Sequence, residues 1–420
     1  MENLYIKGGR ELSGSLEVVT AKNALLPILA GCIISNSNVI IHKVARFSDV
    51  IYMTKILESL GCGIKWDGDT LVIDTSCANS YVVKDEFTKK VRSSIFMLGP
   101  LISRFGRARV AYPGGCNIGN RPIDLHIKGL KALNVKIEER HGYIYCDGRN
   151  MKSGEVHLDF PSVGATENIM MASVMLKGTT TIYNSAREPE IVDLQDFLNS
   201  MGCKVSGAGT STIVINGVDS TLGSEYTPIK DRIVAGTYMI ACAMCGGDIC
   251  LNGANKEHNQ ALITKLNQTG VRIKCRGDTI EVVSKTRPKS ISIIDTQPYP
   301  GFPTDLQNQI LAMQTISRGT SLVVENLFES RFKIVNELTR MGASVTIKDR
   351  MAIINGVSKL YGASVVASDL RGGAGLVLAG LVAEGYTTIE DVYHIDRGYL
   401  SIEEDLCKLG AEIKRCNSET

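Results

Sequence analysis

A short glycine-rich segment places a cysteine and an arginine where neither a regular strand nor a regular helix can form. The segment reads YPGGCNIGNRPIDLH and spans residues 112–126. Its glycines and prolines bend the backbone and keep neighbouring side chains few, so we expect Cys116 to be exposed. From the spacing alone, a structural role and a reactive role for this thiol both stay open.

Positively charged residues recur at corresponding places along the chain. Four arginines lie between an expected strand and the following helix, two lie at or just before the start of a helix, and one lysine has a similar place: Arg121, Arg187, Arg331, Arg397, Arg92, Arg371 and Lys22. Each of them alone suits a surface charge or an ion pair. The formal net charge is only +2, which gives no general attraction to nucleic acid or to an anionic membrane. Together the seven cations predict a local basic cleft between two lobes that binds an anionic ligand.

The pattern LxxΦGxxΦ, in which Φ is an apolar residue, recurs six times. Its first residues are Leu57, Leu130, Leu198, Leu266, Leu338 and Leu406, and they are spaced 68 to 73 residues apart. Asn134 replaces the glycine in one copy, and Thr269 replaces an apolar residue in another. Because self-similarity at a fixed period is the mark of a repeat architecture, the chain is interpreted as six copies of a unit of about 70 residues.

Each copy predicts the same α/β elements. An apolar helical stripe precedes the pattern, as at Val50, Met53 and Leu57, and the glycine or asparagine then ends the helix in a left-handed cap. A strand, a tight turn and a second strand usually follow, as in GIKWDGDTLVID. Another strand lies ahead of that helix, and another apolar helix lies upstream, as in KNALLPILAGC.

The two ends of the chain favour two closed groups of three units over one long solenoid. The last copy ends at EIKRC without a partner strand, and the N-terminal segment NLYIKGG could supply one. We therefore expect lobe one over residues 22–229, which carries the cysteine segment, and lobe two over residues 1–21 plus 230–420, closed by the N-terminal strand. The chain crossings are expected near Lys22 and near Pro228.

The twelve cysteines predict free thiols, since they are scattered through apolar segments of a chain with no apolar signal segment at its start. No apolar run approaches the roughly 18 residues of a membrane span, so we expect a cytoplasmic protein without membrane contact. Cys242 and Cys245 form a CxxC on an expected helix. Without a second cysteine pair or a nearby histidine, they are interpreted as packing residues rather than as a metal or redox site.

Motifs along nearly the whole chain resemble one family. They read TAKNALLPILA, GPLISRFGRARVAYPGGCNIGNRPIDLHIKGL, FPSVGATENIM, AREPEIVDL, PGFPTDLQNQ, SDLRGGAGLVLAGL and HIDRGYLSIEEDL. In this order they are similar to the motifs of the UDP-N-acetylglucosamine 1-carboxyvinyltransferases, enolpyruvyl transferases that begin peptidoglycan precursor synthesis. The resemblance implies a two-lobed, inside-out α/β barrel with three repeated units in each lobe, in agreement with the six copies found independently.

The resemblance also implies an activity. The enolpyruvyl group of phosphoenolpyruvate would pass to the 3'-hydroxyl of UDP-N-acetylglucosamine, and phosphate would be released. This addition and elimination needs acid–base groups, cationic holders and exclusion of water. It needs no metal and no other cofactor, and both partners are small molecules. The sequence leaves the oligomeric state open.

The family pattern assigns catalytic roles to Cys116, Asp305, Lys22 and Arg397. Lys22, Arg121 and Arg397 would hold the phosphate and carboxylate of phosphoenolpyruvate, because guanidinium forks match both anions. Arg92 and Arg371 would add to the same field, and Asp369 would orient this cluster. Cys116 resembles the cysteine that can bond to phosphoenolpyruvate, is proposed as an acid or in product release, and would be alkylated by fosfomycin. Arg121 and the loop amides would favour its thiolate.

The remaining assignments concern the nucleotide sugar. Asp305 would contact the 3'-hydroxyl and take its proton, with an alternative or additional role as the N-cap of the following helix. Asn23 would orient the sugar, and Leu327 with Phe328 would contact it, although apolar residues of this kind are more often core. Arg121, Pro122, Ile123, Asp124 and Leu125 resemble the uridine site. Ser162, Val163 and Gly164 resemble the diphosphate site, at a helix start that would expose amides.

Four residues depart from the pattern expected of the family: Thr20, Val234, Ser330 and Ile334. None of them has a chemical role above, but they put the turnover rate in question. Two other functions stay open. One is an enolpyruvyl transferase that acts on shikimate 3-phosphate, which would not be expected to have the PGGC segment or a nucleotide site. The other is a catalytically weak paralogue that binds UDP-sugar as a sensor.

Overall fold

The computed structural model describes residues 2–88, 91–112 and 123–417. Cys116, Arg121 and Pro122 lie outside this part of the chain. The described residues form two compact units. One consists of the described residues of Thr20–Gly115 and Arg121–Ile229, and the other consists of those of Met1–Val19 and Lys230–Thr420. We call them lobe one and lobe two, as above.

Lobe one contains the central part of the sequence. Its helices are α1 (Lys22–Cys32), α2 (Ser48–Ser59), α3 (Asp85–Thr88), the 3-10 helix η1 (Arg92–Met97), α4 (Leu98–Phe105), α5 (Asp124–Ala132), α6 (Val163–Ser173) and α7 (Pro189–Ser200). Its strands are β3 (Asn38–Ile41), β4 (Gly63–Asp67), β5 (Thr70–Asp74), β6 (Val82–Val83), β7 (Arg107–Ala111), β8 (Lys136–Arg140), β9 (Tyr143–Asp147), β10 (Glu155–His157), β11 (Thr179–Tyr183), β12 (Lys204–Ser206), β13 (Thr212–Asn216) and β14 (Ser224–Tyr226).

Lobe two combines both ends of the chain. Its helices are α8 (Arg232–Cys245), η2 (Glu257–Asn259), α9 (Gln260–Gln268), η3 (Thr304–Leu306), α10 (Gln307–Ile316), η4 (Arg331–Lys333), α11 (Ile334–Arg340), α12 (Leu370–Val382), η5 (Val392–Arg397) and α13 (Ile402–Lys408). Its strands are β1 (Glu2–Lys7), β2 (Leu12–Glu17), β15 (Gly247–Asn252), β16 (Arg272–Arg276), β17 (Thr279–Ser284), β18 (Ile293–Asp295), β19 (Thr320–Val324), β20 (Ser344–Lys348), β21 (Met351–Asn355), β22 (Ser364–Val366), β23 (Tyr386–Glu390) and β24 (Glu412–Asn417).

The strands of the described residues form six four-stranded sheets with one recurring topology. In lobe one the strand orders are β14-β3-β5-β4, β6-β7-β9-β8 and β10-β11-β13-β12, and in lobe two they are β16-β17-β15-β2, β18-β19-β21-β20 and β22-β23-β1-β24. Each sheet contains one parallel pair, such as β10 with β11, and two antiparallel pairs. The predicted six α/β units are confirmed by these six mixed sheets.

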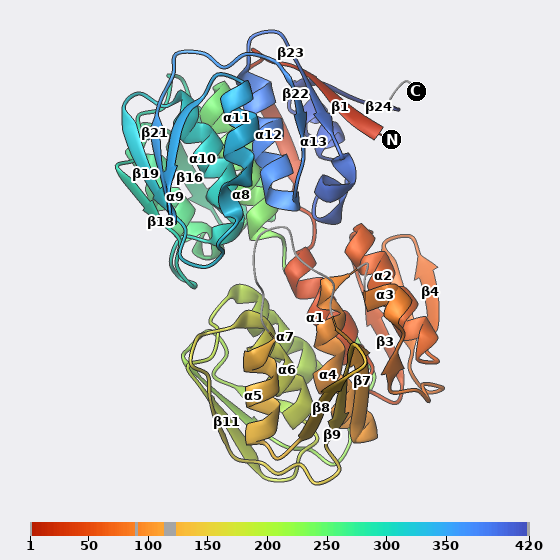
Figure 1. Ribbon diagram of the computed structural model, residues 1–420. Helices are drawn as coiled ribbons and strands as arrows, with labels where there is room; N and C mark the ends of the chain where they lie inside the picture. Colours follow the sequence, from red (N-terminus) through yellow and green to blue (C-terminus); the bar gives the residue numbers. More distant parts are fainter. Residues whose placement is uncertain (1, 89–90, 113–122, 418–420) are drawn as a thin grey trace. The chain divides into compact units, whose positions relative to one another are not determined.

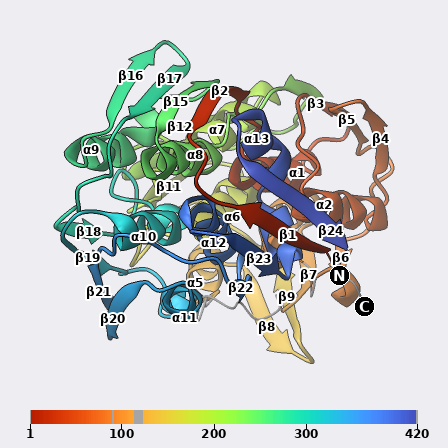
Figure 2. The same cartoon turned by 90° about the horizontal axis from the view of Figure 1, so that it is seen from above.

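Strands from distant parts of the sequence complete the sheets at the chain crossings. β1 lies between β23 and β24, antiparallel to both, with Leu4 opposite Ile389 on one side and Arg415 on the other. β2 runs parallel to β15 (Figure 2). β14 runs parallel to β3. Lobe one therefore closes with strands from the two ends of one continuous segment, whereas lobe two needs the N-terminal residues.

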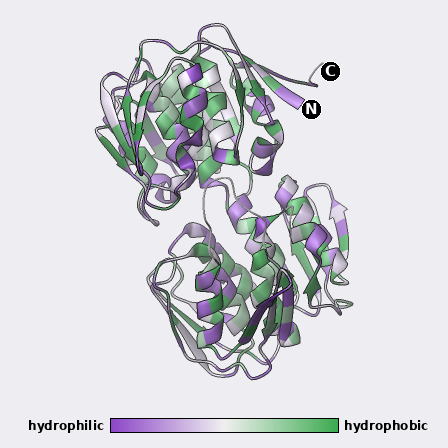
Figure 3. Cartoon of the chain, in the orientation of Figure 1, coloured by the Kyte–Doolittle hydropathy of each residue, from purple (hydrophilic) through white to green (hydrophobic). Residues whose placement is uncertain are grey.

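In each lobe the most buried helices, such as α1 and α6 or α8 and α12, lie inside with sheets around them, whereas helices such as α5 and α13 keep an exposed face (Figure 1). In α1 every residue except Asn23 is buried, and in α8 every residue except Cys245 is buried. A helix that is apolar on all sides is stable only within a core. Figure 3 shows hydrophobic residues along these inner helices and along the strands around them. Lys22 and Arg371, two of the predicted site residues, lie in the first turns of the buried helices α1 and α12.

The described cysteines are free, as predicted. Cys242 and Cys245 both lie on α8, and burial raises the pKa of the Cys242 thiol to about 12. Such thiols are inert packing residues. In the described ranges, no group of three or more His, Cys, Asp or Glu residues could hold a metal ion. No described helix is long and apolar enough to cross a membrane.

Candidate active site

The predicted site residues of lobe one lie at the N-terminal ends of helices. Lys22 and Asn23 begin α1, Arg92 begins η1, and Ser162 is the N-cap of α6. Ile123, Asp124 and Leu125 form the start of α5. The free backbone N–H groups of a first helical turn attract anions, and the helix dipole adds to this attraction. These ends are therefore suited to a phosphorylated ligand.

Lys22 is held by a buried ion pair. Its Nζ lies 2.7 Å from Oδ2 of Asp49, and the two side chains are only 9% and 5% exposed. Asp49 belongs to the first turn of α2, where the helix dipole favours a carboxylate. Because leaving one partner of a buried pair alone is costly, the carboxylate fixes the direction of the ammonium group.

His126 joins the predicted uridine segment to the predicted diphosphate segment. It follows Leu125 on α5, is 7% exposed, and its Nδ1 lies 2.8 Å from Nδ2 of Asn168 on α6. Since the amide nitrogen can only donate, Nδ1 accepts and the proton of the neutral ring is on Nε2. Burial, reinforced by Arg92, lowers the pKa of His126 to about 4, so the ring is neutral at pH 7.

Gly164 gives the close approach of α5 to the start of α6 the room that it needs. A Cβ on Gly164 would lie 3.0 Å from Cε1 and 3.2 Å from Nε2 of His126. The Ser162 hydroxyl accepts a hydrogen bond from the Ala165 amide at 3.4 Å and so caps the helix. The structure thus brings Ile123–Leu125 and Ser162–Gly164, which are far apart in the sequence, to one end of lobe one.

Asp305 is the centre of the site residues in lobe two. Arg331 Nη2 donates to Oδ1 of Asp305 at 2.8 Å, and Arg371 Nη2 donates to Oδ2 at 2.9 Å. The arginine side chains are 2% and 5% exposed, whereas that of Asp305 is 24% exposed. Two guanidinium groups therefore fix the carboxylate from two sides and leave part of it accessible.

The alternative prediction that Asp305 caps the following helix is wrong. Helix α10 begins at Gln307, its N-cap is Leu306, and no side chain caps it. Asp305 itself lies within η3, one turn earlier, where its carboxylate turns to the two arginines. The short 3-10 turn displaces the side chain from the position that a capping residue needs.

Asp369 and Arg371 meet through the backbone rather than through their side-chain charges. Oδ1 of Asp369 accepts from the amides of Arg371 and Gly372 at 3.0 Å each and so caps α12. The same oxygen lies 3.9 Å from Nη1 of Arg331. Burial alone would lower the pKa of Arg371, but the attraction of Asp305 and of further acidic groups raises it above its usual value. Arg371 is therefore always a cation.

Glu325 ties the predicted sugar-contacting segment to the Asp305 turn. This fully buried residue accepts hydrogen bonds from the amides of Leu327 at 2.9 Å and Phe328 at 3.1 Å through Oε1. Its Oε2 accepts from the Thr304 hydroxyl at 2.9 Å. Thr304 directly precedes Asp305, so one carboxylate sets the relative position of both segments.

Arg397 is the last residue of η5 and is partly buried. Its charge lies close enough to His394 to lower the pKa of that imidazole, after the larger effect of burial. Asp369 also acts on His394, in the opposite direction. The charges at the C-terminal end of η5 and at the N-cap of α12 therefore both act on the same histidine of lobe two.

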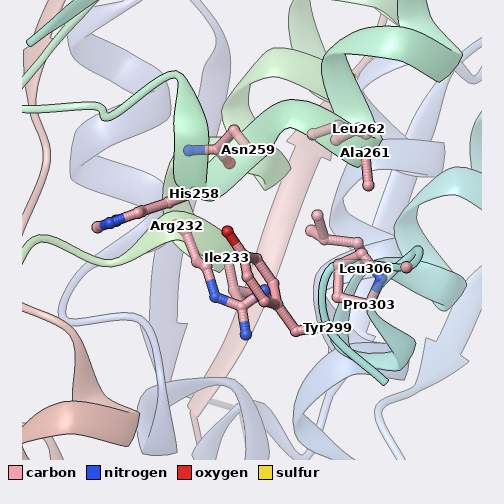
Figure 4. A pocket seen from close by; sticks show the side chains of 10 residues that line it. Arg232, Ile233, His258, Asn259, Ala261, Leu262, Tyr299, Pro303 and Leu306 are labelled. Carbon is pink, nitrogen blue, oxygen red and sulfur yellow. The ribbon is translucent and has the colours of Figure 1, made fainter. Parts of the chain in front are cut away.

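A small pocket lies beside η3 in lobe two (Figure 4). It is lined by Arg232, Ile233, His258, Asn259, Ala261, Leu262, Tyr299, Gly301, Pro303 and Leu306. The Arg232 guanidinium lies over the Tyr299 ring, 5.5 Å from its centre. The enclosed space of the pocket, about 10 Å³, is no larger than the roughly 10–15 Å³ that one water molecule needs. The pocket alone is therefore too small for a nucleotide sugar.

Sequence reasoning missed Asp49, His126, Glu325 and Thr304, and it gave Arg331 only a general place among the recurring cations. The signal for Asp49 was an acidic residue in the first turn of an amphipathic helix. His126 directly follows the predicted uridine segment, which was also a usable signal. Glu325 had no comparable signal, because its role depends on loop contacts.

The fold and the matching family model define the class of protein. Residues 6–406 match the family described as EPSP synthase (3-phosphoshikimate 1-carboxyvinyltransferase). The enolpyruvyl transferase NikO from Streptomyces tendae has a similar structure, with a TM-score of 0.87 at 23% identity over 99% of this chain and 98% of that one. EPSP synthase from Acinetobacter baumannii gives a TM-score of 0.76 at 16% identity over 99% and 100% of the two chains. The fold is that of the carboxyvinyltransferases.

Full-length relatives identify the particular group. UDP-N-acetylglucosamine 1-carboxyvinyltransferase 2 from Caldanaerobacter subterraneus subsp. tengcongensis is 51% identical over 99% of this chain and all of its own length. UDP-N-acetylglucosamine 1-carboxyvinyltransferase 1 from Carboxydothermus hydrogenoformans is 47% identical over 100% of this chain and 99% of its own. This chain belongs to the UDP-N-acetylglucosamine 1-carboxyvinyltransferases, within the EPSP synthase family.

Proposed function

We propose that this chain transfers the enolpyruvyl group of phosphoenolpyruvate to the 3'-hydroxyl of UDP-N-acetylglucosamine and releases phosphate, as the first committed step of peptidoglycan precursor synthesis. Relatives with this name match the chain from end to end at about half of all positions. The geometry that carries the proposal is the Asp305 carboxylate, which two buried guanidinium groups hold in one orientation.

The chemistry is an addition followed by an elimination. The methylene carbon of phosphoenolpyruvate gains a proton while the sugar hydroxyl loses one, and the sugar oxygen then bonds to the cationic carbon. Phosphate leaves, and loss of a proton from the new methyl group restores the double bond. The enzyme must therefore provide a base for the hydroxyl, an acid for the methylene carbon and cations for the phosphate and carboxylate.

Lobe two supplies the base. Asp305 receives the proton of the 3'-hydroxyl, because its carboxylate is oriented by Arg331 and Arg371 and stays partly accessible. A carboxylate fixed in this way needs no reorganisation at the moment of proton transfer. Leu327 and Phe328, which Glu325 places beside this turn, contact the sugar, and Asp369 orients the N-terminal end of the helix that bears Arg371.

The cations divide between the lobes. Lys22, oriented by Asp49, and Arg397, at the end of η5, hold phosphoenolpyruvate together with Arg121. Arg92 and Arg371 add positive charge, and Asn23 orients the sugar. Cys116 acts as the acid or in product release. Cys116 and Arg121 lie outside the described residues, so their roles rest on the family pattern alone.

The nucleotide half of the substrate binds lobe one. The start of α5, with Ile123, Asp124 and Leu125 after Arg121 and Pro122, takes the uridine. The amides of Ser162, Val163 and Gly164 take the diphosphate at the N-terminus of α6. His126 keeps these two helix starts in contact. Both substrates are phosphorylated and do not cross membranes unaided, which supports a cytoplasmic site of action. Neither nucleic acid nor a membrane is a partner in this proposal.

The experiment follows phosphate release and hydrogen exchange in heavy water. Purified protein with both substrates should release one phosphate for each acceptor consumed, and deuterium should appear in the methylene group of the enolpyruvyl product. Phosphate release without deuterium incorporation would contradict addition and elimination. No phosphate release with both substrates present would favour the weak UDP-sugar-binding paralogue.

A further inference from the structure

Arg415 uses all of its hydrogen-bond donors on three carboxylates. Nε and Nη2 donate to the two oxygens of Glu403 at 2.7 and 3.0 Å. Nη2 and Nη1 donate to the two oxygens of Asp396 at 2.7 and 3.0 Å, and Nη1 also donates to Glu2 at 3.0 Å. A guanidinium group has five N–H bonds, so this arginine is saturated.

The contacts of Arg415 join four elements at the closure of lobe two. Arg415 lies on β24, Glu2 on β1, Asp396 on η5 and Glu403 on α13. The side chains of Arg415 and Glu403 are 20% and 13% exposed, so these charges are mostly shielded from solvent. The two bidentate pairs on one planar guanidinium fix both the orientation of the two carboxylates and their distance from Arg415. A single exposed ion pair does neither.

The two bidentate partners bracket the segment that carries Arg397. Asp396 precedes Arg397 directly, and Glu403 lies in the first turn of the next helix. Between them, the buried Tyr399 has its hydroxyl 2.7 Å from Oγ1 of Thr237 on α8. The backbone that presents Arg397 is thus anchored on both sides, to the sheet through Asp396 and to an inner helix through Tyr399.

Asp396 is also a potential competitor for Arg397. A carboxylate next to a substrate-binding arginine can pair with that arginine and so weaken its hold on an anionic ligand. Here both oxygens of Asp396 already accept hydrogen bonds from Arg415. The pairing draws this carboxylate to β24 and lowers its electrostatic competition with the substrate.

We infer that Arg415 is a positioning residue for phosphoenolpyruvate binding, which acts through Asp396 on Arg397. The inference rests on the proposed role of Arg397 as a holder of phosphoenolpyruvate. Arg415 itself needs no contact with the substrate. Its effect should therefore concern phosphoenolpyruvate and spare UDP-N-acetylglucosamine.

The test compares Arg415→Gln, Arg415→Lys and Asp396→Asn with Lys7→Gln. Lys7 lies at the other end of the same strand pair, with its Nζ 3.7 Å from Oε1 of the partly exposed Glu412. Initial rates give KM for each substrate. Arg415→Gln should raise KM for phosphoenolpyruvate by about tenfold, and Asp396→Asn, which loses the anchor but also the competing charge, should raise it by about threefold. Neither variant should change KM for UDP-N-acetylglucosamine by more than about twofold. The lysine variant should recover only part of the loss, since it lacks the planar fork. The control should change neither constant.

Equal increases in both KM values, or none in either, would overturn the inference. If Arg415→Gln does not fold, Asp396→Asn decides, because it leaves the bonds of Arg415 to Glu403 and Glu2 in place.

A double-mutant cycle separates this inference from the proposed function. Arg397→Ala alone should raise KM for phosphoenolpyruvate, and adding Arg415→Gln should then change it by less than about twofold, because the two residues act as a unit. A full further increase in the double variant would overturn the inference alone. An unchanged KM in Arg397→Ala would overturn the proposed role of Arg397 and the inference with it.

Discussion

At the scale of single residues, the site depends on polar groups that fix one another before any substrate binds. Asp305 is held by Arg331 and Arg371, and Lys22 is held by Asp49. All of these pairs have at least one side chain that is almost fully buried. Such pairs add little to stability compared with well-packed apolar residues, but they give the reacting groups defined directions. The function of these pairs is therefore orientation.

Replacing Asp305 tests whether this oriented carboxylate is the base that takes the hydroxyl proton. Asp305→Asn keeps the shape of the side chain, but its single amide oxygen can accept from only one of the two arginines, and an amide cannot take the hydroxyl proton. We expect kcat to fall by about 100-fold or more, the usual contribution of a general base. Steady-state phosphate release measures the change, and Asp278→Asn, in an exposed turn of the same lobe, should leave kcat unchanged. A variant with near-normal kcat would exclude Asp305 as the base.

His126 predicts a pH dependence of stability. Its pKa is about 4 in the folded chain and about 6.5 when exposed, so between these values the unfolded chain binds more protons. Stability contributed by the neutral ring is therefore lost as pH falls from about 6.5 to about 4, by at most about 3 kcal/mol.

His126→Gln should flatten this part of the pH profile, whereas the same change at exposed His157 should not. Thermal unfolding of each variant between pH 7 and pH 4 measures the effect. A wild-type profile with the same slope as His126→Gln would show that folding does not lower the pKa of His126.

The sequence allowed roles to be predicted for single residues, but it did not show which side chains would contact one another. Asp305, Asp369 and Arg371 could be named in advance because they stand in recognisable motifs. Arg331 lies 26 residues from Asp305, and their contact depends on how η3 and η4 pack. Glu325 was missed for the same reason, since a buried carboxylate that binds loop amides leaves no periodic signal.

At the scale of elements, the repeat pattern predicted the helix ends well. The predicted cap residues all have a positive φ between 64° and 97°: Gly61, Asn134, Gly202, Gly270, Gly342 and Gly410. The left-handed conformation needs glycine or asparagine, so a local rule sufficed. Strand pairing was harder. No local signal indicates that β2 joins β15 or that β14 joins β3, because each pair joins strands that are far apart in the sequence.

Two arginines close the C-terminal ends of inner helices in an equivalent way. After α1, Arg104 Nη1 donates to the carbonyls of Ile33, at 2.9 Å, and of Ser35, and its Nη2 donates to Thr75 O at 2.8 Å. After α10, Arg287 donates to the carbonyls of Ile316, Ser317 and Val357. The carbonyls of Ile33, Ile316 and Ser317 stand at helix ends, where the helices leave them without partners, whereas those of Ser35, Thr75 and Val357 belong to neighbouring segments.

Removing either arginine should destabilise its lobe. We expect Arg104→Ala and Arg287→Ala each to lower the free energy of unfolding by about 2–3 kcal/mol, because partly buried carbonyls lose charged donors. Urea denaturation measures the change. Arg276→Ala is the control, since its side chain is 75% exposed and pairs only weakly with Glu281. A loss no larger than in this control would show that water replaces the guanidinium at no cost.

At the scale of the whole molecule, chain order and sheet membership make the two lobes unequal. The strands of the three sheets in lobe one lie between Asn38 and Tyr226, within one continuous segment. Lobe two needs β1 between β23 and β24, and β2 beside β15. One continuous segment therefore contains all described strands of lobe one, whereas the strands of lobe two come from both ends of the chain.

This difference predicts the behaviour of fragments. Residues 20–229 produced alone should fold with cooperative thermal unfolding, whereas residues 230–420 alone should not, because β24 loses its strand partner and β15 loses one neighbour. Circular dichroism and the dispersion of amide NMR signals distinguish the two outcomes. Cooperative folding of the second fragment would show that the N-terminal strands are dispensable.

The central claim concerns which acceptor receives the enolpyruvyl group. The most direct measurement is phosphate release from phosphoenolpyruvate with UDP-N-acetylglucosamine or shikimate 3-phosphate as the acceptor, at equal enzyme concentration. We predict turnover with the nucleotide sugar, loss of that turnover in Asp305→Asn, and no turnover with shikimate 3-phosphate. Turnover with shikimate 3-phosphate alone would contradict the account.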